Sequence, residues 1–280
     1  MHRHRVARDL LVLSFLATQL VGQRPPLAYE FRDLCPLLFS ISGTSDGKRL
    51  WAAGSDGVIL ESGGDGHWMP RSSGTKDILH SIFVADGGRR IWVVGTSGTI
   101  LESGDGEHWN ARASGTKQAL VSISGTRDGS RLWAVGTGGT ILESSDGERW
   151  EPRVSGTRSD LHSIFVTEGG GRLWAAGSNG TILESSDGEH WEPRTSGTIR
   201  YIYSIFGTAD GGHLWALGDS ILESSDGSHW TESTRGVHQG LFDRSLRIRD
   251  SRRQARMDGG RRQRSGVRRW RKLEGAHQLD

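Results

Sequence analysis

Short apolar runs alternate with glycine-rich stretches from residue 39 to residue 230. Between residues 161 and 194 the runs read LHSIFV, RLWAAG, GTILES and HWEPR. Runs of about five residues have the usual length of β-strands, and none continues with the 3.6-residue period of an amphipathic helix. The glycine, asparagine and aspartate between the runs tolerate the positive φ of tight turns. The pattern therefore predicts four antiparallel strands, connected by hairpins, in each such segment.

Ten of the eleven tryptophans fall into two regular series, which give the length of the repeated segment. The first series, at intervals of 41 residues, is Trp51, Trp92, Trp133, Trp174 and Trp215. The second series, at intervals of 41 residues and finally 39, is Trp68, Trp109, Trp150, Trp191 and Trp230. One small sheet cannot bury both of its faces, so such repeats stack on one another. We therefore predict an all-β fold, a β-propeller of about five four-stranded antiparallel blades with 41-residue repeats.

The two tryptophan series have different expected positions. The first lies mid-strand among apolar neighbours, as in RLWAVG, and is expected to fill the space between blades. The second closes the hairpin that contains Asp-Gly and is expected to pack back over it. The fifth repeat lacks the final R-x-S-G-T segment, so we expect either a short ring with weak closure or an open series of blades that self-associates.

The block SSDGEHW from Ser185 to Trp191 resembles the Asp-box, or BNR, motif of sialidase-like propellers. Equivalent blocks, called box turns below, run from Ser103 to Trp109, Ser144 to Trp150 and Ser224 to Trp230. In the first repeat Gly64 takes the aspartate position and Asp65 is shifted by one residue. The wider string from Leu132 to Thr157 resembles the photosystem II assembly/stability factor family. The resemblance covers about residues 39–230 and implies a propeller fold.

The aspartates of the box turns are candidates for a structural role. They are Asp105, Asp146, Asp187 and Asp226. A turn aspartate accepts backbone N–H hydrogen bonds while the following glycine takes positive φ. Calcium needs six to eight oxygen ligands, whereas each turn reliably supplies one carboxylate. We therefore expect turn-stabilising aspartates and no metal site, and we find no motif for a cofactor.

Two rows of arginines are candidates for binding an anionic partner. One row, Arg90, Arg131 and Arg172, follows the hairpins between the first and second strands, as does Arg49 in the first repeat. The other row, Arg112, Arg153 and Arg194, precedes the S-G-T segments, as does Arg71. Either row could engage an anion. The alternative is that each arginine pairs with a neighbouring glutamate such as Glu61, Glu102, Glu143 or Glu184.

Catalytic motifs are absent from the sequence. A sialidase needs an arginine cluster and a Tyr–Glu nucleophile pair, and the only tyrosines are Tyr29, Tyr201 and Tyr203. His80 and His162 each precede a serine, but Val121 and Tyr203 occupy the same position in other repeats, which argues against a catalytic triad. We predict a non-catalytic protein-interaction or assembly scaffold with a protein or glycan partner. The alternative is a multivalent carbohydrate-binding lectin with surface tryptophans, and a sialidase-like glycoside hydrolase is less favoured.

Charge divides the chain into parts. Residues 39–230 carry 16 Lys and Arg against 24 Asp and Glu, whereas residues 231–280 carry 14 against 6. The latter segment is predicted to be a disordered basic tail, because it has almost no apolar content. Residues 1–28 predict a signal peptide, with a basic start and an apolar run over residues 10–22 that is too short to span a bilayer. Residues 29–230 then form the propeller, which is expected to be secreted or periplasmic, with no nucleic-acid partner and no stable membrane insertion.

Overall fold

A computed structural model describes residues 36–233, which form five four-stranded antiparallel sheets. The predicted signal peptide, and the predicted basic tail beyond Ser233, lie outside the described residues. Each sheet corresponds to one sequence repeat and is called a blade below, numbered 1 to 5 in chain order. The predicted propeller of five four-stranded antiparallel blades is confirmed.

Strands follow the same order in every blade. The first strands are β1 (Leu38–Gly43), β5 (Leu79–Ala85), β9 (Leu120–Gly125), β13 (Leu161–Val166) and β17 (Ile202–Gly207). The second strands are β2 (Leu50–Gly54), β6 (Arg90–Gly95), β10 (Leu132–Gly136), β14 (Leu173–Gly177) and β18 (Leu214–Gly218). The third strands are β3 (Ile59–Ser62), β7 (Ile100–Ser103), β11 (Ile141–Ser144), β15 (Ile182–Ser185) and β19 (Ile221–Ser224). The fourth strands are β4 (Trp68–Arg71), β8 (Asn110–Arg112), β12 (Glu151–Arg153), β16 (Glu192–Arg194) and β20 (Thr231–Glu232).

The turn between the second and third strands explains part of the glycine-rich pattern. In blade 4 it is the 3-10 turn η5 (Ser178–Gly180), in which Asn179 has φ 57° and Gly180 has φ 66°. A left-handed backbone is inexpensive for glycine and asparagine. A side chain at Gly180 would also place its Cβ 1.9 Å from the carbonyl oxygen of Thr198, so this position requires glycine.

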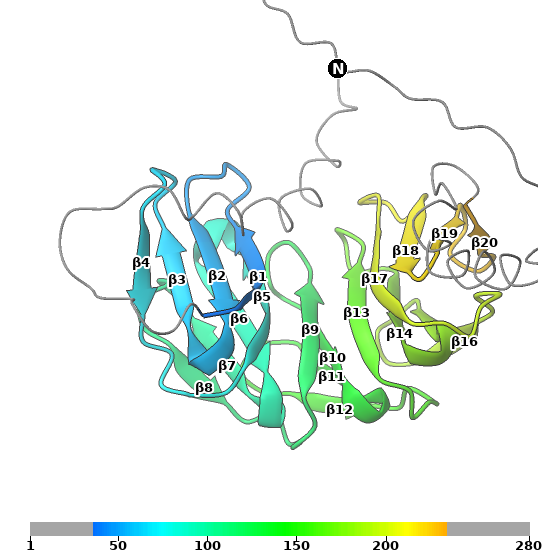
Figure 1. The fold of residues 1–280 in the computed structure, drawn as a ribbon, viewed down its shortest axis with the longest axis horizontal. Helices are drawn as coiled ribbons and strands as arrows, with labels where there is room; N and C mark the ends of the chain where they lie inside the picture. The colour runs from blue at the N-terminus through cyan, green and yellow to red at the C-terminus, as the bar shows by residue number, and fades with distance from the viewer. Residues whose placement is uncertain (1–35, 234–280) are drawn as a thin grey trace, which may run out of the picture. The chain divides into compact units, whose positions relative to one another are not determined.

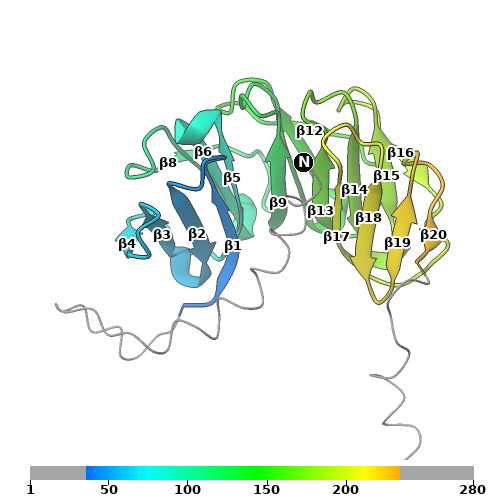
Figure 2. The ribbon, with the colours of Figure 1, turned by 90° about the horizontal axis from the view of Figure 1, so that it is seen from above.

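The blades follow one another side by side in chain order (Figures 1 and 2), and their first strands pack against each other. A serine in the first strand of blades 1 to 4 bonds to the next blade, as when the Ile205 N–H donates to Ser163 Oγ at 3.1 Å. Four apolar cores lie between successive blades, from the joint of blades 1 and 2 to that of blades 4 and 5. The core of this protein is therefore divided among the joints between sheets.

Tryptophans of the first series fill these joints, as predicted, in four of five blades. Trp51, Trp92, Trp133 and Trp174 are fully buried. Trp215 of blade 5 is only partly buried, so the prediction is wrong for this residue. The reason is that the described residues contain no blade beyond blade 5, and no apolar core there joins blade 5 to blade 1.

Candidate interaction surface

The box turns are held by their aspartates. Asp105 Oδ1 accepts the N–H groups of Glu107 and His108, both at 2.8 Å, and its Oδ2 lies 2.8 Å from the His108 ring. The backbone and side-chain hydrogen bonds from His108 hold the pKa of Asp105 well below its usual range. The hydrogen bond and charge of Asp105 in turn raise the pKa of His108. Equivalent N–H bonds are made by Asp146, Asp187 and Asp226.

Metal binding receives no support from the geometry of these turns. Neighbouring box turns each present a single aspartate whose oxygens already accept bonds from their own turn. Residues 36–233 contain no group of three or more His, Cys, Asp or Glu side chains that could hold a metal ion. The contribution of these aspartates to the free energy of unfolding stays a prediction, to be tested by substitution.

Each box turn also packs against the joint with the preceding blade. The glycine after the box aspartate has positive φ and lies against the first-series tryptophan of that blade. A Cβ on Gly188 would lie 2.5 Å from Trp133 Nε1, and one on Gly106 would lie 2.5 Å from Trp51 Nε1. The glycine is therefore needed both for its backbone conformation and for close contact with an indole ring.

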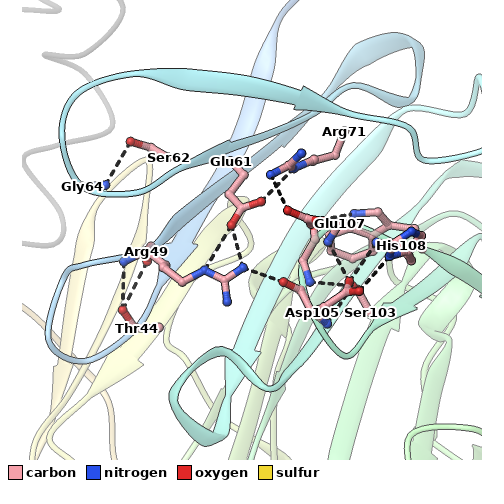
Figure 3. A network of polar contacts seen from close by, with 12 residues as sticks. Thr44, Arg49, Glu61, Ser62, Gly64, Arg71, Ser103, Asp105, Glu107 and His108 are labelled. Atoms are coloured by element: carbon pink, nitrogen blue, oxygen red, sulfur yellow. Dashed lines mark hydrogen bonds and ion pairs between the residues drawn. The ribbon is translucent and has the colours of Figure 1, made fainter.

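The arginine rows belong to the same joints (Figure 3). Arg49 donates to Glu61 at 2.6 Å and to the carbonyl oxygen of Asp105 in the next blade, while Arg71 donates to the other oxygen of Glu61 at 2.8 Å. The guanidinium of Arg49 also lies over the Trp51 ring, 4.6 Å from its centre. The same carbonyl contacts are made by Arg90, Arg131 and Arg172. The second row bonds its glutamates in the same way, through Arg112, Arg153 and Arg194.

These contacts correspond to the glutamate-pairing alternative for the arginines. Burial opposes ionisation of Glu184, but the hydrogen bonds and charges of Arg194 and Arg172 outweigh it and lower the pKa of this carboxyl. An anionic partner would have to compete with these bonds, since the guanidinium groups are already engaged within the blades. Binding of an anion by either row stays a prediction.

Exposed apolar side chains gather along the first strands instead. In each repeat, one residue precedes and one follows the first leucine or isoleucine of the first strand, which is Leu38, Leu79, Leu120, Leu161 or Ile202. We call the larger side chains at these two positions the inner-strand stripe, which consists of Leu37, Phe39, Ile78, His80, Val121, His162, Tyr201 and Tyr203. Tyr203 is 59% exposed, Tyr201 51% and Phe39 42%. The exposed apolar members of the stripe therefore lie in blades 1, 2 and 5, whereas Val121 and His162 of blades 3 and 4 are partly buried.

Aromatic contacts within the stripe connect neighbouring blades. The rings of Tyr201 and Tyr203 are stacked at 6.1 Å with an angle of 8° between their planes. His162 of blade 4 lies 6.2 Å from both rings, and its Nε2 lies 3.0 Å from Ser178 Oγ. Phe39 contacts His80 edge-on at 5.8 Å. Sequence analysis identified this strand position only as a variable one, because the repeat alone does not show which face of the first strand lacks a neighbour.

A polar hollow of about 540 Å³ lies where the turns between first and second strands meet. Its lining comes from four blades and includes Ser45, Gly87, Asp128 and Glu168. The ion pair between Arg127 and Glu168, at 2.8 Å, crosses from blade 3 to blade 4 beside it. The lining is polar, in contrast to the apolar stripe on the first strands.

Solved structures with this architecture decide the class of fold. One is described as YCF48 bound to D1 peptide, with 19% identity, a TM-score of 0.56, and coverage of 70% of this chain and 66% of that one. The chain is a β-propeller. An ancestral GH74 enzyme matches with 14% identity, a TM-score of 0.61, and coverage of 72% and 32%. The GH74 enzyme of Niastella koreensis matches with 15% identity, a TM-score of 0.58, and coverage of 68% and 37%.

These likenesses show the fold of the propeller and nothing finer. No protein-family model and no curated protein sequence matches the chain. The chain spans 66% of the YCF48 structure and about a third of the two GH74 enzymes, so the activities and partners of those proteins are not transferred with the fold. Within residues 36–233 no helix is long and apolar enough to cross a membrane.

One part of the lectin alternative needs correction. It relied on surface tryptophans repeated in every blade, but the first series is buried in blades 1 to 4. In the second series Trp150, Trp191 and Trp230 are also buried. Their rings pack over the box turns, and Trp191 Nε1 donates to the Gly188 carbonyl at 3.1 Å. Repeated tryptophan sites for sugars are therefore not present in these blades.

Proposed function

We propose that this propeller is a non-catalytic protein-interaction scaffold that binds an extended segment of a partner protein along the inner-strand stripe. The observation that supports this proposal is the exposure of apolar and aromatic side chains of the stripe in blades 1, 2 and 5, namely Leu37, Phe39, Ile78, Tyr201 and Tyr203. Contiguous exposed apolar surface is typical of interaction sites, and tyrosine is enriched at them because it has an apolar ring and a polar end.

One of the solved neighbours supports a protein ligand. A propeller of the same fold, YCF48, is described as bound to a D1 peptide. An extended peptide could contact side chains from several blades at once, since the stripe follows five adjacent first strands. The partner of this chain is therefore proposed to be a flexible, partly apolar peptide segment.

A glycoside hydrolase activity is disfavoured by the state of the buried acids. Such enzymes hold one carboxyl protonated as a general acid and place a second one beside it. The arginines on either side of Glu184 instead lower its pKa. Glu61 and Glu143 also accept hydrogen bonds from two arginines each. These carboxylates are already hydrogen-bonded to arginines at the joints between blades. We therefore propose that this chain shares the fold of the two GH74 enzymes but not their activity.

Carbohydrate binding is the second candidate function, and the stacked pair Tyr201 and Tyr203 favours it. Flat exposed aromatic faces are suitable for contact with sugar rings, and His162 beside them supplies a polar group. This candidate predicts binding at blade 5 alone, whereas the peptide proposal predicts contributions from blade 1 as well.

A paired array experiment separates these candidates. The full chain is applied to an array of synthetic peptides that tile envelope and membrane proteins, and to a glycan array, and each hit is then titrated in solution. For a peptide ligand, Tyr203→Ser and Phe39→Ser should each weaken binding by about tenfold or more. Val154→Ser is the control, because Val154 is 84% exposed and lies outside the stripe. A peptide whose affinity is the same for all variants would contradict the proposal, and a glycan sensitive only to Tyr203→Ser would favour the lectin.

Export is a separate proposal, which rests on residues 1–28. Their basic start and apolar run over residues 10–22 are typical of a signal peptide. Fusion of residues 1–28 to a reporter that is active only outside the cytoplasm tests it. A reporter without activity would contradict the proposal, provided that the same reporter with an established signal peptide is active.

A further inference from the structure

Among residues 36–233, two faces of the five blades have no neighbouring blade, and these faces carry the residues of an internal joint. In the joint between blades 4 and 5, the outgoing face supplies Trp174, Ala176 and Ile182, all at most 1% exposed. The incoming face supplies apolar residues of the first three strands of blade 5, such as Ile202 and Leu214. The other three joints use equivalent positions.

The outgoing face of blade 5 repeats this apolar set, and no other blade among residues 36–233 covers it. Trp215, Leu217 and Ile221 occupy the positions of Trp174, Ala176 and Ile182 in blade 4. All three are only partly buried. Replacement of the usual alanine or valine by leucine at position 217 enlarges the apolar surface of this face.

The incoming face of blade 1 is the matching half. Leu38 is 42% exposed, whereas its equivalent in blade 2, Leu79, is fully buried. Leu50 and Leu60 are also only partly buried. Their equivalents in blade 2 are Ile91, which is fully buried, and Leu101, which is 3% exposed.

The serine and the turn that make close contacts in an internal joint also have equivalents on these two faces, the serine on blade 5 and the turn on blade 1. Ser204 has the position of Ser163, which accepts the N–H of Ile205 in the next blade, but the described residues include no blade after it. On blade 1, Asp65 takes the repeat position of Gly188, and Gly66, the next residue, has no atom within 4 Å of its Cβ position. In the internal joint the Cβ position of Gly188 lies against a tryptophan of the preceding blade.

We propose that these faces bind each other between two copies of this chain, so that blade 1 of one copy packs on blade 5 of another, head to tail. The joint would continue the apolar contacts of the four internal ones. The sequences of residues 1–35 and 234–280 contain neither the ILES motif nor the DGxxW motif of a blade. A fifth joint within one copy is not formed among the described residues.

Both halves of this joint differ from the internal pattern at the same contact. Inside the propeller, Arg172 donates to the carbonyl oxygen of the box aspartate in the next blade. In blade 5 the arginine is replaced by His213, and in blade 1 the box has Gly64 and Asp65 in place of Asp-Gly. An imidazole beside the Asp65 turn thus replaces the arginine contact, and the apolar residues are left as the main source of affinity. We therefore expect association that is reversible and insensitive to salt.

A pair of complementary variants of the full 280-residue chain tests the proposal. Leu217→Asp blocks the outgoing face and Leu38→Asp blocks the incoming face, and each leaves the other face intact. The wild-type weight-average mass, from light scattering, should rise with concentration and persist in about 0.5 M NaCl. Each variant should raise the apparent Kd at least about tenfold, because association would bury a carboxylate. Mixing the two variants should restore a 1:1 dimer and nothing larger, because one good face remains on each.

The control is Val154→Asp, which changes an exposed apolar residue that lies on neither face. It should associate like the wild type. Circular dichroism confirms that the variants are folded, and Leu38→Lys with Leu217→Lys replaces the pair if the aspartates prevent folding. A wild type that is monomeric up to about 100 µM overturns the proposal. It is also overturned if association is lost in salt, if neither variant weakens it, or if the mixed variants form no dimer.

Discussion

Removal of one buried indole tests whether stability resides in the joints between blades. Trp133 is fully buried, lies against the box glycine Gly188 of the next blade, and carries the guanidinium of Arg131 4.7 Å above its ring. Trp133→Ala therefore removes a large side chain from a site closed on both sides. Losses for fully buried aromatic residues are about 3–5 kcal/mol of unfolding free energy. We expect a loss in this range.

Trp215→Ala is the matched control, because Trp215 has the same place in its blade but only one neighbouring blade. Its cost should be about half as large, about 1.5–2.5 kcal/mol, since part of its surface is already in contact with water. The assay is urea denaturation followed by far-UV circular dichroism, at a concentration where light scattering gives a monomer. Equal losses for the two variants, or a loss below about 1 kcal/mol for Trp133→Ala, would refute the reasoning.

Three further predictions concern the box turns. Asp146→Ala should cost about 1 kcal/mol at neutral pH, as for loss of a local cap. Because the native pKa of Asp146 is lowered, mainly by backbone hydrogen bonds, thermal melts should show this difference shrinking as the pH falls below about 4. Gly188→Ala should cost at least about 2 kcal/mol by urea denaturation, and Gly197→Ala, which has positive φ but open space, about 1 kcal/mol. His190→Ala should lower the melting temperature more at about pH 5.5 than at about pH 9, because the raised pKa of His190 makes its contribution largest below about pH 6.5 and lost above its native pKa. Equal effects of His190→Ala at both pH values would contradict this.

The strand pattern could be predicted from sequence because each strand is bounded by residues with a strong local preference. Asn179 and the glycines after the box aspartates mark turns that few other residues can make. The 41-residue spacing of Trp51 and its equivalents then required stacked sheets. These are local or periodic signals, so no long-range information was needed.

The partners of individual side chains in three dimensions were harder to predict from the sequence. The sequence placed Arg131 and Glu143 in the same repeat but left open whether the arginine binds its glutamate or a partner, because both need the same residue types. The periodic pattern also predicted a buried Trp215, because a repeat does not reveal which blade lacks a successor. The inner-strand stripe was missed for a similar reason, since Phe39 and Tyr203 occupy positions that are ordinary strand positions until one face is known to be free.

The contacts across each joint also suggest an order of folding during synthesis. Trp92 bonds to Gly147, 55 residues later, and the Ile123 N–H bonds to Ser81, 42 residues earlier. Trp174 bonds to Gly227, 53 residues later, and the Ile205 N–H bonds to Ser163, 42 residues earlier, so these bonds are made with the adjacent repeat and do not wait for the opposite end of the chain. A newly made blade therefore keeps its outgoing indole uncovered only until the next repeat leaves the ribosome. The vulnerable apolar surface moves along the chain as it grows, and a pause in translation would expose one tryptophan face at a time rather than a whole core.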